Sequence, residues 1–468
     1  MAGMVESAVS IANNVLWTYV LIALLIGLGI YFTVRTRFVQ FRYFADSVRL
    51  LGAGTASGTG VSSFGAFAVG TAARVGTGNL AGVALAIAVG GPGAVFWMWM
   101  IALIGAASAF VESTLAQVYK VRDGDTFRGG PAYYMERALG QRWMGILFAV
   151  LITFTFGLVF SSVQANTISL AFEEAYGIPR LLMGVLVTVP VALVIFGGIK
   201  RIARVAEVLV VFMAVPYVLM ALFIVVVNFT EIPRVLGLIV GNAFGIGPAV
   251  GGGFGAAIMQ GVRRGLFSNE AGMGSAPNAA ATADVSHPAK QGLVQSLGVF
   301  IDTLVICSAT AFVILFSGIY ESGEADGIVL TQQALGSHIG GWSVAFISFA
   351  VMMFAFSSII ANYYYGETNI EFITGDDRYV LYYRIAVMAL VLFGSVAALE
   401  LVWALADLFM GTMALVNLIA IALLAPVALA VLRDYSRQRA AGRDPVFEAK
   451  NVRDLKNVEV WGGSDRVR

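Results

Sequence analysis

The residues from Arg74 to Gly82 carry the densest polar chemistry in a long apolar run and read RVGTGNLAG. Three glycines weaken a helix here, while an arginine, a threonine and an asparagine bring polar side chains to mid-membrane depth. Backbone groups left unpaired in hydrocarbon are costly, so an unwound stretch persists only where protein, water or a ligand satisfies them. The stretch therefore predicts a helix that is broken at a binding site. The alternative is a glycine face packed tightly between helices.

A second glycine-rich element, at 251–255, reads GGGFG and precedes the stretch 256–261. Two such breaks at one depth would expose free N–H and C=O groups together. Helix N-terminal ends attract a carboxylate and unwound carbonyls attract a cation, so a zwitterionic amino acid beside Na⁺ fits the pair. Neither half of the chain offers a buried carboxylate pair or a series of histidines that would indicate a dedicated proton relay.

Composition places these breaks in a membrane protein. Only 12% of the 468 residues are charged and 59% are hydrophobic, and the mean hydropathy is +0.84, whereas soluble domains carry about 25% charged residues. A net charge of +1 argues against nucleic acid as a partner. The single cysteine, Cys307, excludes an intrachain disulfide, and His287 and His338 are too far apart in sequence to indicate a metal-binding cluster. With one cysteine and two histidines, the chain is also poor in the side chains that a membrane-embedded enzyme would need.

Apolar runs of spanning length predict eleven transmembrane helices. The first is expected to be a retained helix rather than a signal peptide, because no Lys or Arg precedes it and four arginines follow it. The expected spans cover residues 15–34, 61–90, 93–118, 143–171, 181–199, 204–229, 249–268, 292–318, 339–361, 380–399 and 403–432.

The distribution of basic residues predicts a cell-membrane protein with its N-terminus outside and its C-terminal tail in the cytoplasm. With eleven spans, the outer loops hold only Arg180 and Arg234, and Arg74 lies within a span. The other residues among the 29 Lys and Arg fall in the cytoplasmic loops, their flanks and the tail, with the three in 263–291 counted among them. An even number of spans would destroy this separation.

The spans divide into one extra helix and two sets of five. In each set the glycine-broken span comes first, at 61–90 and 249–268. Broken helices at corresponding positions of two halves indicate an inverted-repeat secondary transporter with its site at mid-membrane depth. We therefore expect an all-α polytopic membrane protein. Its parts would be 1–60, the extra helix with a cytoplasmic loop; 61–229, the first five-helix repeat; 249–432, the second; and 433–468, a cytoplasmic tail.

Six long motifs in the membrane region carry a family resemblance. They are RRGLFSNEAGMGSAP at 263–277, GTGNLAGVALAIAVGGPGAVFWMW at 76–99, GGPAYY at 129–134, VQAN at 163–166, QGLVQSLGVFIDT at 291–303 and FAFSSIIANYYYGE at 354–367. These strings resemble the alanine or glycine:cation symporter family, the sodium:alanine symporters. The resemblance covers the membrane region and does not extend to the tail at 433–468. It implies a leucine-transporter-like fold, a 5+5 inverted repeat preceded by one extra helix.

The resemblance also implies a substrate site. The wider fold carries a GxGN string in its first core helix, matched here at 76–79. By that match the substrate carboxylate would meet backbone and hydroxyl at Thr77 and Gly78, and Asn79 would help to fix the polar end. Gln164, in the third core helix, would contact the substrate. The opposing broken helix would contribute Gly252, Gly253 and Phe254.

A sodium site is implied between the first and eighth core helices. Its ligands would be the carbonyls of Ala72 and Val75 and the hydroxyls of Ser357 and Ser358. Hard cations take oxygen ligands, so this set suits Na⁺. Some relatives carry Thr in place of Ser358, which would keep the hydroxyl.

Asn362 departs from the family pattern, since some relatives carry Trp there. It lies four residues after Ser358 and so shares its helix face. An amide leaves more room than an indole and offers both donors and an acceptor. We expect Asn362 to line the substrate site and to admit small polar side chains such as serine or glutamine. The alternative is that it only caps or packs a neighbouring helix.

Charged residues inside spans usually pair with one another or mark a pathway. Arg74 is the deepest and should need a carboxylate, for which Glu270 and Asp302 are both candidates. Structural pairing is the preferred interpretation over a role in coupling. Further charged residues in or at the ends of spans are Glu112, Glu207 and Asp407.

The two glycine-broken spans predict a secondary transporter, and the family resemblance implies sodium-coupled symport of small neutral amino acids, alanine and glycine among them, into the cell by alternating access. No covalent chemistry is implied, and no cofactor apart from Na⁺ as the coupling ion. Among carriers, the alternatives are proton coupling or a preference for serine or glutamine. A channel is the alternative from another class, and the symmetric pair of broken helices favours a carrier over it.

Overall fold

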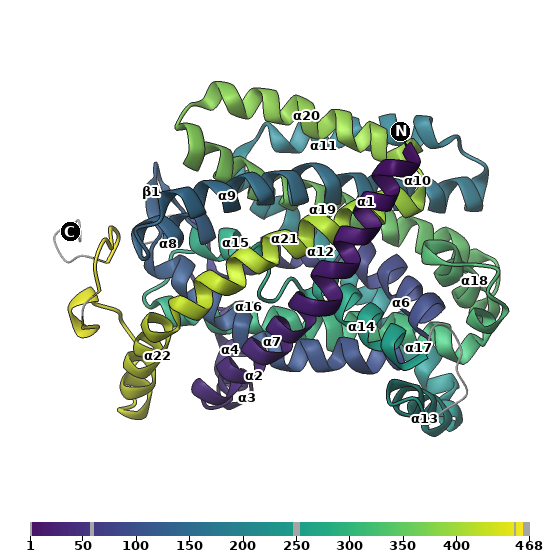
Figure 1. Cartoon of the computed structure of the whole chain (residues 1–468), viewed down its shortest axis with the longest axis horizontal. Helices are drawn as coiled ribbons and strands as arrows, with labels where there is room; N and C mark the ends of the chain where they lie inside the picture. The colour runs from purple at the N-terminus through teal and green to yellow at the C-terminus, as the bar shows by residue number, and fades with distance from the viewer. Residues whose placement is uncertain (1, 57–59, 247–252, 454, 462–468) are drawn as a thin grey trace.

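Helices make up nearly the whole protein in the computed structural model, which describes residues 2–56, 60–246, 253–453 and 455–461 (Figure 1). Within these residues, eight helices are long and apolar enough to cross a membrane, and a bent pair adds a ninth. The prediction of an all-α polytopic membrane protein is confirmed. A single small antiparallel sheet is present in this described part of the chain.

The labels of Figure 1 follow the chain. The first part contains α1 (Ala2–Val15), η1 (Leu16–Leu21), α2 (Ile22–Arg35), α3 (Val39–Arg42) and α4 (Phe44–Leu51). The second contains α5 (Ser63–Arg74), η2 (Gly78–Gly82), α6 (Val83–Gly90), α7 (Gly93–Val118), β1 (Val121–Asp123), β2 (Thr126–Arg128), α8 (Pro131–Arg137), α9 (Arg142–Ile152), η3 (Thr153–Phe160), α10 (Ser161–Tyr176), α11 (Arg180–Ile195), α12 (Gly198–Val227), η4 (Phe229–Glu231) and α13 (Ile232–Ala243). The third contains α14 (Gly253–Asn269), α15 (Ala276–Thr282), α16 (Pro288–Val299), η5 (Phe300–Cys307), α17 (Ser308–Ser317), η6 (Ile319–Ser322), α18 (Gly327–Ile339), α19 (Trp342–Thr374), α20 (Asp377–Val396), α21 (Leu399–Leu423), α22 (Ala425–Ala440) and η7 (Ala449–Asn451).

Every predicted span overlaps a helix, although two of these helices are short. α11 has 16 residues and α14 has 17, fewer than the roughly 20 that a straight crossing needs. The number of eleven spans therefore stays a prediction, as do the boundaries of the four parts.

The outer helices present apolar side chains to their surroundings. Along α12, for example, Val208, Phe212 and Leu219 are each more than half exposed. A contiguous apolar face of this kind is a liability in water and is what a lipid-facing helix requires. The exposed face therefore supports a position of α12 at the lipid boundary.

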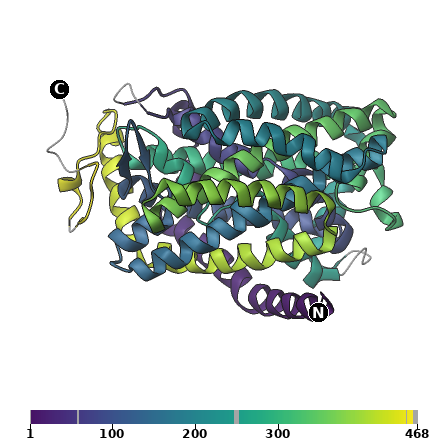
Figure 2. The same cartoon turned by 90° about the horizontal axis from the view of Figure 1, so that it is seen from above.

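The first helix lies on the outside of the helical body (Figure 2). It runs from α1 through η1 into α2 and packs against α7 and α21. Trp17 anchors it, because the ring is fully buried and its Nε1 donates a hydrogen bond of 3.1 Å to the Asp407 carbonyl. The extra helix is thus fastened to the last long apolar helix of the body.

The first core helix is broken, as the stretch 74–82 predicts. α5 ends at Arg74, the helix resumes at Gly78, and the two parts are bent by 49°. Val75 leaves the helical conformation with a ψ of 84°, although its N–H still bonds the Thr71 carbonyl at 2.7 Å. The polar residues that follow Val75 therefore lie on unwound backbone, away from a regular helical ladder.

The second break in the described residues lies after α14, whereas 253–255, the described part of the predicted break at 251–255, belong to α14 itself. α14 is uninterrupted over its 17 residues, and the chain unwinds between α14 and α15. Glu270, Gly272 and Gly274 have φ of +57°, +84° and +88° there, a region that favours glycine. The glycines that begin α14 instead occupy a first turn, where backbone N–H groups lack helical partners in any case.

Arg263 and Arg264, which the sequence analysis counted with a cytoplasmic loop and its flanks, lie inside α14 and within the predicted span 249–268. Nη2 of Arg264 lies 2.5 Å from Oδ2 of Asp407 on α21, and Nη1 of Arg263 lies 3.6 Å from the same oxygen. A carboxylate from a distant helix allows both charges to be buried. These two arginines can therefore no longer be counted among the basic residues that favour a cytoplasmic side. The orientation of the chain in the membrane stays a prediction.

The last predicted span, 403–432, is divided in the structure. α21 ends at Leu423 and α22 begins at Ala425, with Pro426 in its first turn. Proline has no N–H and clashes with the preceding turn, so one helix ends and another starts here. α22 then continues beyond 433, where the sequence placed the start of the tail.

The described part of the tail packs against the body beside β1 and α8 (Figure 1). Phe447 is 2% exposed, and its ring lies 5.3 Å from the ring of His287 and 5.4 Å from that of Trp461. Its N–H donates to the Ser286 carbonyl at 2.9 Å, and Trp461 Nε1 donates to the Gln117 carbonyl at 2.8 Å. These contacts, the tail clasp, join the end of the chain to the end of α7 and the link before α16.

Candidate functional site

The first break and the end of α14 meet at Gly78. A Cβ at this position would lie 2.9 Å from Cδ1 of Phe267 and 3.3 Å from Cα of Ser268. A Cβ on Gly76 would collide with the Ser358 hydroxyl on α19. The glycines of the GxGN string therefore allow the break to contact α14 on one side and α19 on the other.

Side chains satisfy the backbone of the first break. The Thr77 N–H donates to Oε1 of Gln164 at 3.0 Å, and the Gly76 N–H donates to Oδ1 of Asn79 at 3.0 Å. Asn79 is held in turn, because its Nδ2 donates to Oδ1 of Asp302 at 2.7 Å. The structure thus brings the predicted residues Thr77, Gly78, Asn79 and Gln164 together, while their role in substrate binding stays a prediction.

Two buried polar side chains near these elements have unused hydrogen-bonding capacity. Among the residues that the structure describes, neither the Thr77 hydroxyl nor either amide atom of Asn362 has a hydrogen-bond partner. Both side chains are fully buried. A buried polar group without a partner costs about 1–3 kcal/mol, which a ligand can recover. Asn362 is available to a ligand rather than occupied as a helix cap, and it lies one turn past Ser358.

The predicted sodium ligands are only partly assembled. The Ser358 hydroxyl donates to the Ala72 carbonyl at 2.8 Å, which places one oxygen from α19 against one from α5. The Ser357 hydroxyl instead donates to the Phe354 carbonyl of its own helix at 2.8 Å and contacts the Met213 sulfur. Val75 is buried at the start of the break. The geometry therefore distinguishes Ser358 from Ser357.

Phe254 does not reach the break, which corrects its predicted place in the site. Its side chain is 49% exposed and faces Trp97, with ring centroids 6.5 Å apart. Phe267 lies 13 residues further along α14, or about 20 Å at the helical rise. Gly253 begins the same helix and is equally distant from the break, and Gly252 lies outside the described residues. Phe267 and Ser268 take the place that the sequence gave to Gly253 and Phe254.

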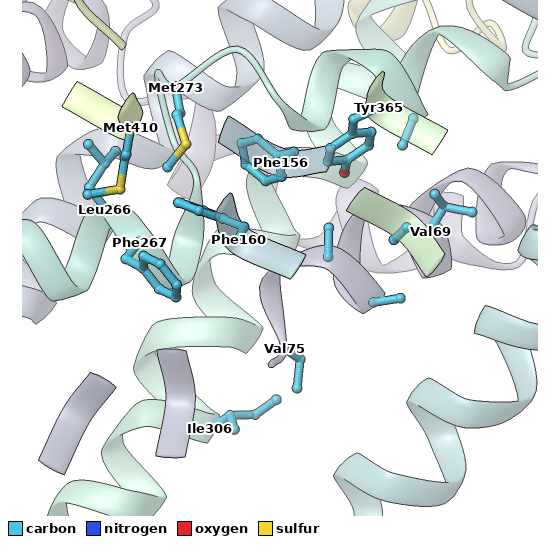
Figure 3. Packing of buried hydrophobic residues seen from close by; sticks show 14 of the residues in the cluster. Val69, Val75, Phe156, Phe160, Leu266, Phe267, Met273, Ile306, Tyr365 and Met410 are labelled. Atoms are coloured by element: carbon cyan, nitrogen blue, oxygen red, sulfur yellow. The ribbon is translucent and has the colours of Figure 1, made fainter. Parts of the chain in front are cut away.

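An aromatic layer covers the break on the side of α14. The Phe267 ring lies 4.5 Å from the ring of Phe160 and 4.8 Å from that of Trp403, and Figure 3 shows Phe160 and Phe267 side by side. The Arg264 guanidinium lies over Trp403 at 4.7 Å, next to Asp407. This side of the site is closed by tilted aromatic rings in contact and then by a buried ion pair.

Of the residues in this layer, Phe267 falls within the motif at 263–277, where the family resemblance could have indicated it. Phe160, Trp403 and Asp407 lie in other spans. Asp407 is distinguished by its charge within a span, whereas no local pattern distinguishes Phe160 and Trp403 from ordinary residues of apolar helices. Only the packing of η3, α14 and α21 brings the three together.

Arg74 forms no ion pair within 4.0 Å to any carboxylate in the described part of the chain. It is 1% exposed, and its Nη1 lies 3.4 Å from the Gln295 carbonyl. Its charge acts through space on Glu112, Glu270 and Asp302. Glu270 and Asp302, the two predicted partners, therefore lie near Arg74, as does Glu112. None of the three forms an ion pair with it.

Glu112 of α7 satisfies the backbone of the second break. Its Oε1 accepts a hydrogen bond from the Gly272 N–H and its Oε2 accepts one from the Gly274 N–H, each at 3.1 Å. Asn417 Nδ2 also donates to Oε2, at 2.8 Å. A carboxylate from α7 therefore replaces the helical hydrogen bonds that the unwound segment lacks.

Comparisons with known proteins show the family. The model of the sodium:alanine symporter family matches residues 2–449. The chain is 56% identical to the probable sodium/glutamine symporter GlnT of Bacillus subtilis, with 99% of this chain and 98% of that protein covered. It is 56% identical to the amino-acid carrier protein AlsT of the same organism, with 98% of each covered. It is 36% identical to the sodium/alanine symporter AgcS of Methanococcus maripaludis, with 95% and 99% covered.

Solved structures support the fold. A manganese transporter from Eremococcus coleocola superimposes with a TM-score of 0.53, at 15% identity, over 82% of this chain and 81% of that one. The transporter MhsT superimposes with a TM-score of 0.50, at 15% identity, over 84% and 91%. At these identities the likeness concerns the fold alone, which is leucine-transporter-like.

Proposed function

Because the chain belongs to the sodium:alanine symporter family, we propose that it imports small neutral amino acids, alanine and glycine among them, by sodium-coupled symport. The family and the structural neighbours are transporters rather than enzymes. The observation that carries the proposal is the first break, where the Thr77 N–H faces Gln164 while the Ala72 carbonyl faces Ser358. Amide and hydroxyl donors suit a carboxylate, and the adjacent oxygens suit a cation.

In this proposal the substrate and the ion share one depth, and the surrounding helices expose that depth to each side in turn. The aromatic layer of Phe160, Phe267 and Trp403, backed by Arg264 and Asp407, closes one side. Opening that side requires α14 and α21 to separate. The proposed orientation keeps the N-terminus outside and the tail in the cytoplasm.

Transport by the purified protein in liposomes tests the proposal. An inward Na⁺ gradient should drive accumulation of labelled alanine and glycine, and uptake should saturate with substrate. Uptake driven equally well by a proton gradient without sodium would favour proton coupling. Flux that does not saturate would favour a channel.

Gln164→Ala should weaken substrate uptake and leave Na⁺ binding in place. The substitution removes the acceptor of the Thr77 N–H and so loosens the break at the proposed carboxylate site. We expect the KM for alanine to rise about tenfold, a change of about 1.4 kcal/mol. The measurement is initial uptake rate against alanine concentration at saturating Na⁺.

Gln332→Ala is the matched control for this variant. Gln332 is as deeply buried and bonds the Ala171 carbonyl and the Ser348 hydroxyl, away from the break. If both variants lose folded protein and neither changes the KM, Gln164 has only a structural role.

A second candidate substrate class, amino acids with polar side chains such as serine or glutamine, is favoured by Asn362. Its amide is fully buried with neither atom hydrogen-bonded within the described residues, and the name of a relative at 56% identity specifies glutamine. Asn362→Trp should narrow the range toward the smallest amino acids, because an indole fills the space of the amide. Asn362→Leu should keep the volume and remove the hydrogen bonds.

Competition against labelled alanine uptake measures both variants. Serine and glutamine should compete at least about fivefold less well in either variant, a difference of roughly 1 kcal/mol, while sodium dependence is retained. Equal competition before and after both substitutions would show that Asn362 does not shape the pocket.

A further inference from the structure

Asp302 joins the two broken helices of the site. It lies in η5, is fully buried, and accepts hydrogen bonds on both carboxylate oxygens. Oδ1 accepts from Asn79 Nδ2 at 2.7 Å, in the first break. Oδ2 accepts from the Ser268 hydroxyl at 2.8 Å, at the end of α14, and from the neighbouring Thr303 hydroxyl at 2.8 Å. One side chain on a third helix thus holds a polar residue from each broken helix.

The contact with Asn79 fixes which way the Asn79 amide faces. Because Nδ2 donates to Asp302, Oδ1 is directed at the Gly76 N–H, which it accepts at 3.0 Å. An amide that rotated by half a turn would present a donor to the N–H and an acceptor to the carboxylate, and both contacts would be lost. The carboxylate of Asp302 therefore determines how the backbone of the first break is held.

The contact with Ser268 fixes the distance between the two breaks. Gly78 and Ser268 already lie close enough that a Cβ on Gly78 would come within 3.3 Å of the Ser268 backbone. Since Asp302 bonds both Asn79 and Ser268, movement of α14 away from the first break stretches two charge-assisted hydrogen bonds. The geometry of the unwound segment and its distance from α14 depend on the same side chain.

We infer that Asp302 is a positioning residue for substrate binding, which acts by holding Asn79 and Ser268 and does not itself contact the substrate. The inference rests on the proposed function, since it concerns the affinity of the same site. It assigns the residue a role that pairing with Arg74 does not provide, because Arg74 interacts with it only through space. The hydrogen bonds, rather than the charge, carry this role.

The inference distinguishes two replacements of Asp302. An asparagine keeps the shape, and its amide can accept from Asn79 and donate to the hydroxyls of Ser268 and Thr303. An alanine keeps none of these contacts. If positioning is the role, Asp302→Asn should bind substrate within about threefold of the unchanged protein, and Asp302→Ala should bind it at least about tenfold more weakly.

A double-mutant cycle with Asn79 tests the route of the effect. The probe is labelled L-alanine, with L-glutamine as a second probe, in equilibrium binding to the purified full chain at saturating Na⁺. Asn79→Ala should weaken binding at least about tenfold, and adding Asp302→Ala should weaken it by a smaller factor than Asp302→Ala does alone, because the contact with Asn79 is already lost and only the contact with Ser268 remains to be removed. Independent, multiplying effects would overturn the inference.

If Asp302→Ala does not fold, exchanging the amide and the carboxylate between positions 79 and 302 tests the inference instead. Asn79→Asp alone places two carboxylates where an amide and a carboxylate now lie 2.7 Å apart, and it should weaken binding and lower the melting temperature. Combining it with Asp302→Asn restores an amide opposite a carboxylate and should recover most of the affinity. Failure of the swap to recover binding would overturn the inference.

The remaining outcomes are also decisive. If Asp302→Asn binds as poorly as Asp302→Ala and shifts the Na⁺ dependence, the charge of Asp302 matters and the positioning role is wrong. If the unchanged protein binds neither probe, the proposed function fails at that step, before any variant is compared. The two failures are therefore separable.

Discussion

Ser358→Ala should raise the Na⁺ concentration for half-maximal uptake at least tenfold, or by about 1.4 kcal/mol of ion-binding energy. The substitution removes the hydroxyl that lies against the last turn of α5, 2.8 Å from the Ala72 oxygen. Na⁺ depends on oxygen ligands from the protein, so losing one of a small set weakens binding directly. The measurement is uptake of labelled alanine at fixed substrate over a series of Na⁺ concentrations.

Ser357→Ala is the matched control, and the structure separates the two serines where the family resemblance does not. The Ser357 hydroxyl bonds its own helix at Phe354 and touches Met213. We expect its removal to shift the Na⁺ dependence by less than about threefold. Equal shifts in the two variants would mean that the ion lies between both hydroxyls. If uptake by Ser358→Ala depends on Na⁺ concentration as in the unchanged protein, Na⁺ does not bind at Ala72 and Ser358.

Asp407→Asn should lower the free energy of unfolding by about 3–5 kcal/mol. It should also reduce amino-acid uptake to less than about a tenth of that of the unchanged protein. The carboxylate faces the guanidinium groups of Arg264 at 2.5 Å and Arg263 at 3.6 Å inside the helical body. Removing it leaves two buried cations without their counter-charge, which costs far more than a surface pair. Thermal unfolding in detergent, followed by tryptophan fluorescence, measures the loss of stability alongside uptake.

Two controls sharpen this test. Asp376→Asn breaks an ion pair with Arg378, whose side chain is 85% exposed, and should change little. Arg264→Gln added to Asp407→Asn should recover part of the stability, because fewer buried charges are left unpaired. A melting temperature for Asp407→Asn equal to that of Asp376→Asn would contradict the prediction that this buried pair holds α14 to α21.

Local sequence was enough to predict the first break and insufficient for the second. Between 74 and 82, glycines and polar residues interrupt an apolar run, and the chain does unwind there. In the second predicted break, the described residues 253–255 only begin a helix. The true second break is stabilised by Glu112, which lies 160 residues from Gly272 in sequence. No window along the chain contains both residues, so their pairing is tertiary information.

The same limit applies to Arg263 and Arg264. Their sequence positions, near the end of a predicted span, count them on the cytoplasmic flank because two adjacent charges are costly within a span. Arg264 is buried and Arg263 mostly buried because Asp407, 143 residues from Arg264, lies opposite. Family resemblance located Gln164 near Thr77, since the motif carries spatial information from related proteins. It gave Phe254 the place that Phe267 occupies, because the second break had been assigned to the wrong glycines.

The tail clasp has a consequence for the order in which the chain is made. Its receiving surface, around Gln117 and Ser286, is synthesised before the two aromatic residues that cover it, Phe447 and Trp461. At about 5–20 residues per second, the stretch from Ser286 to Trp461 takes the ribosome roughly 10–35 s to translate. During that time the rest of the second half is made while this surface stays uncovered. We therefore expect a chain that stalls or ends before Phe447 to expose the surface around Gln117 and Ser286 to the quality-control machinery of the cell.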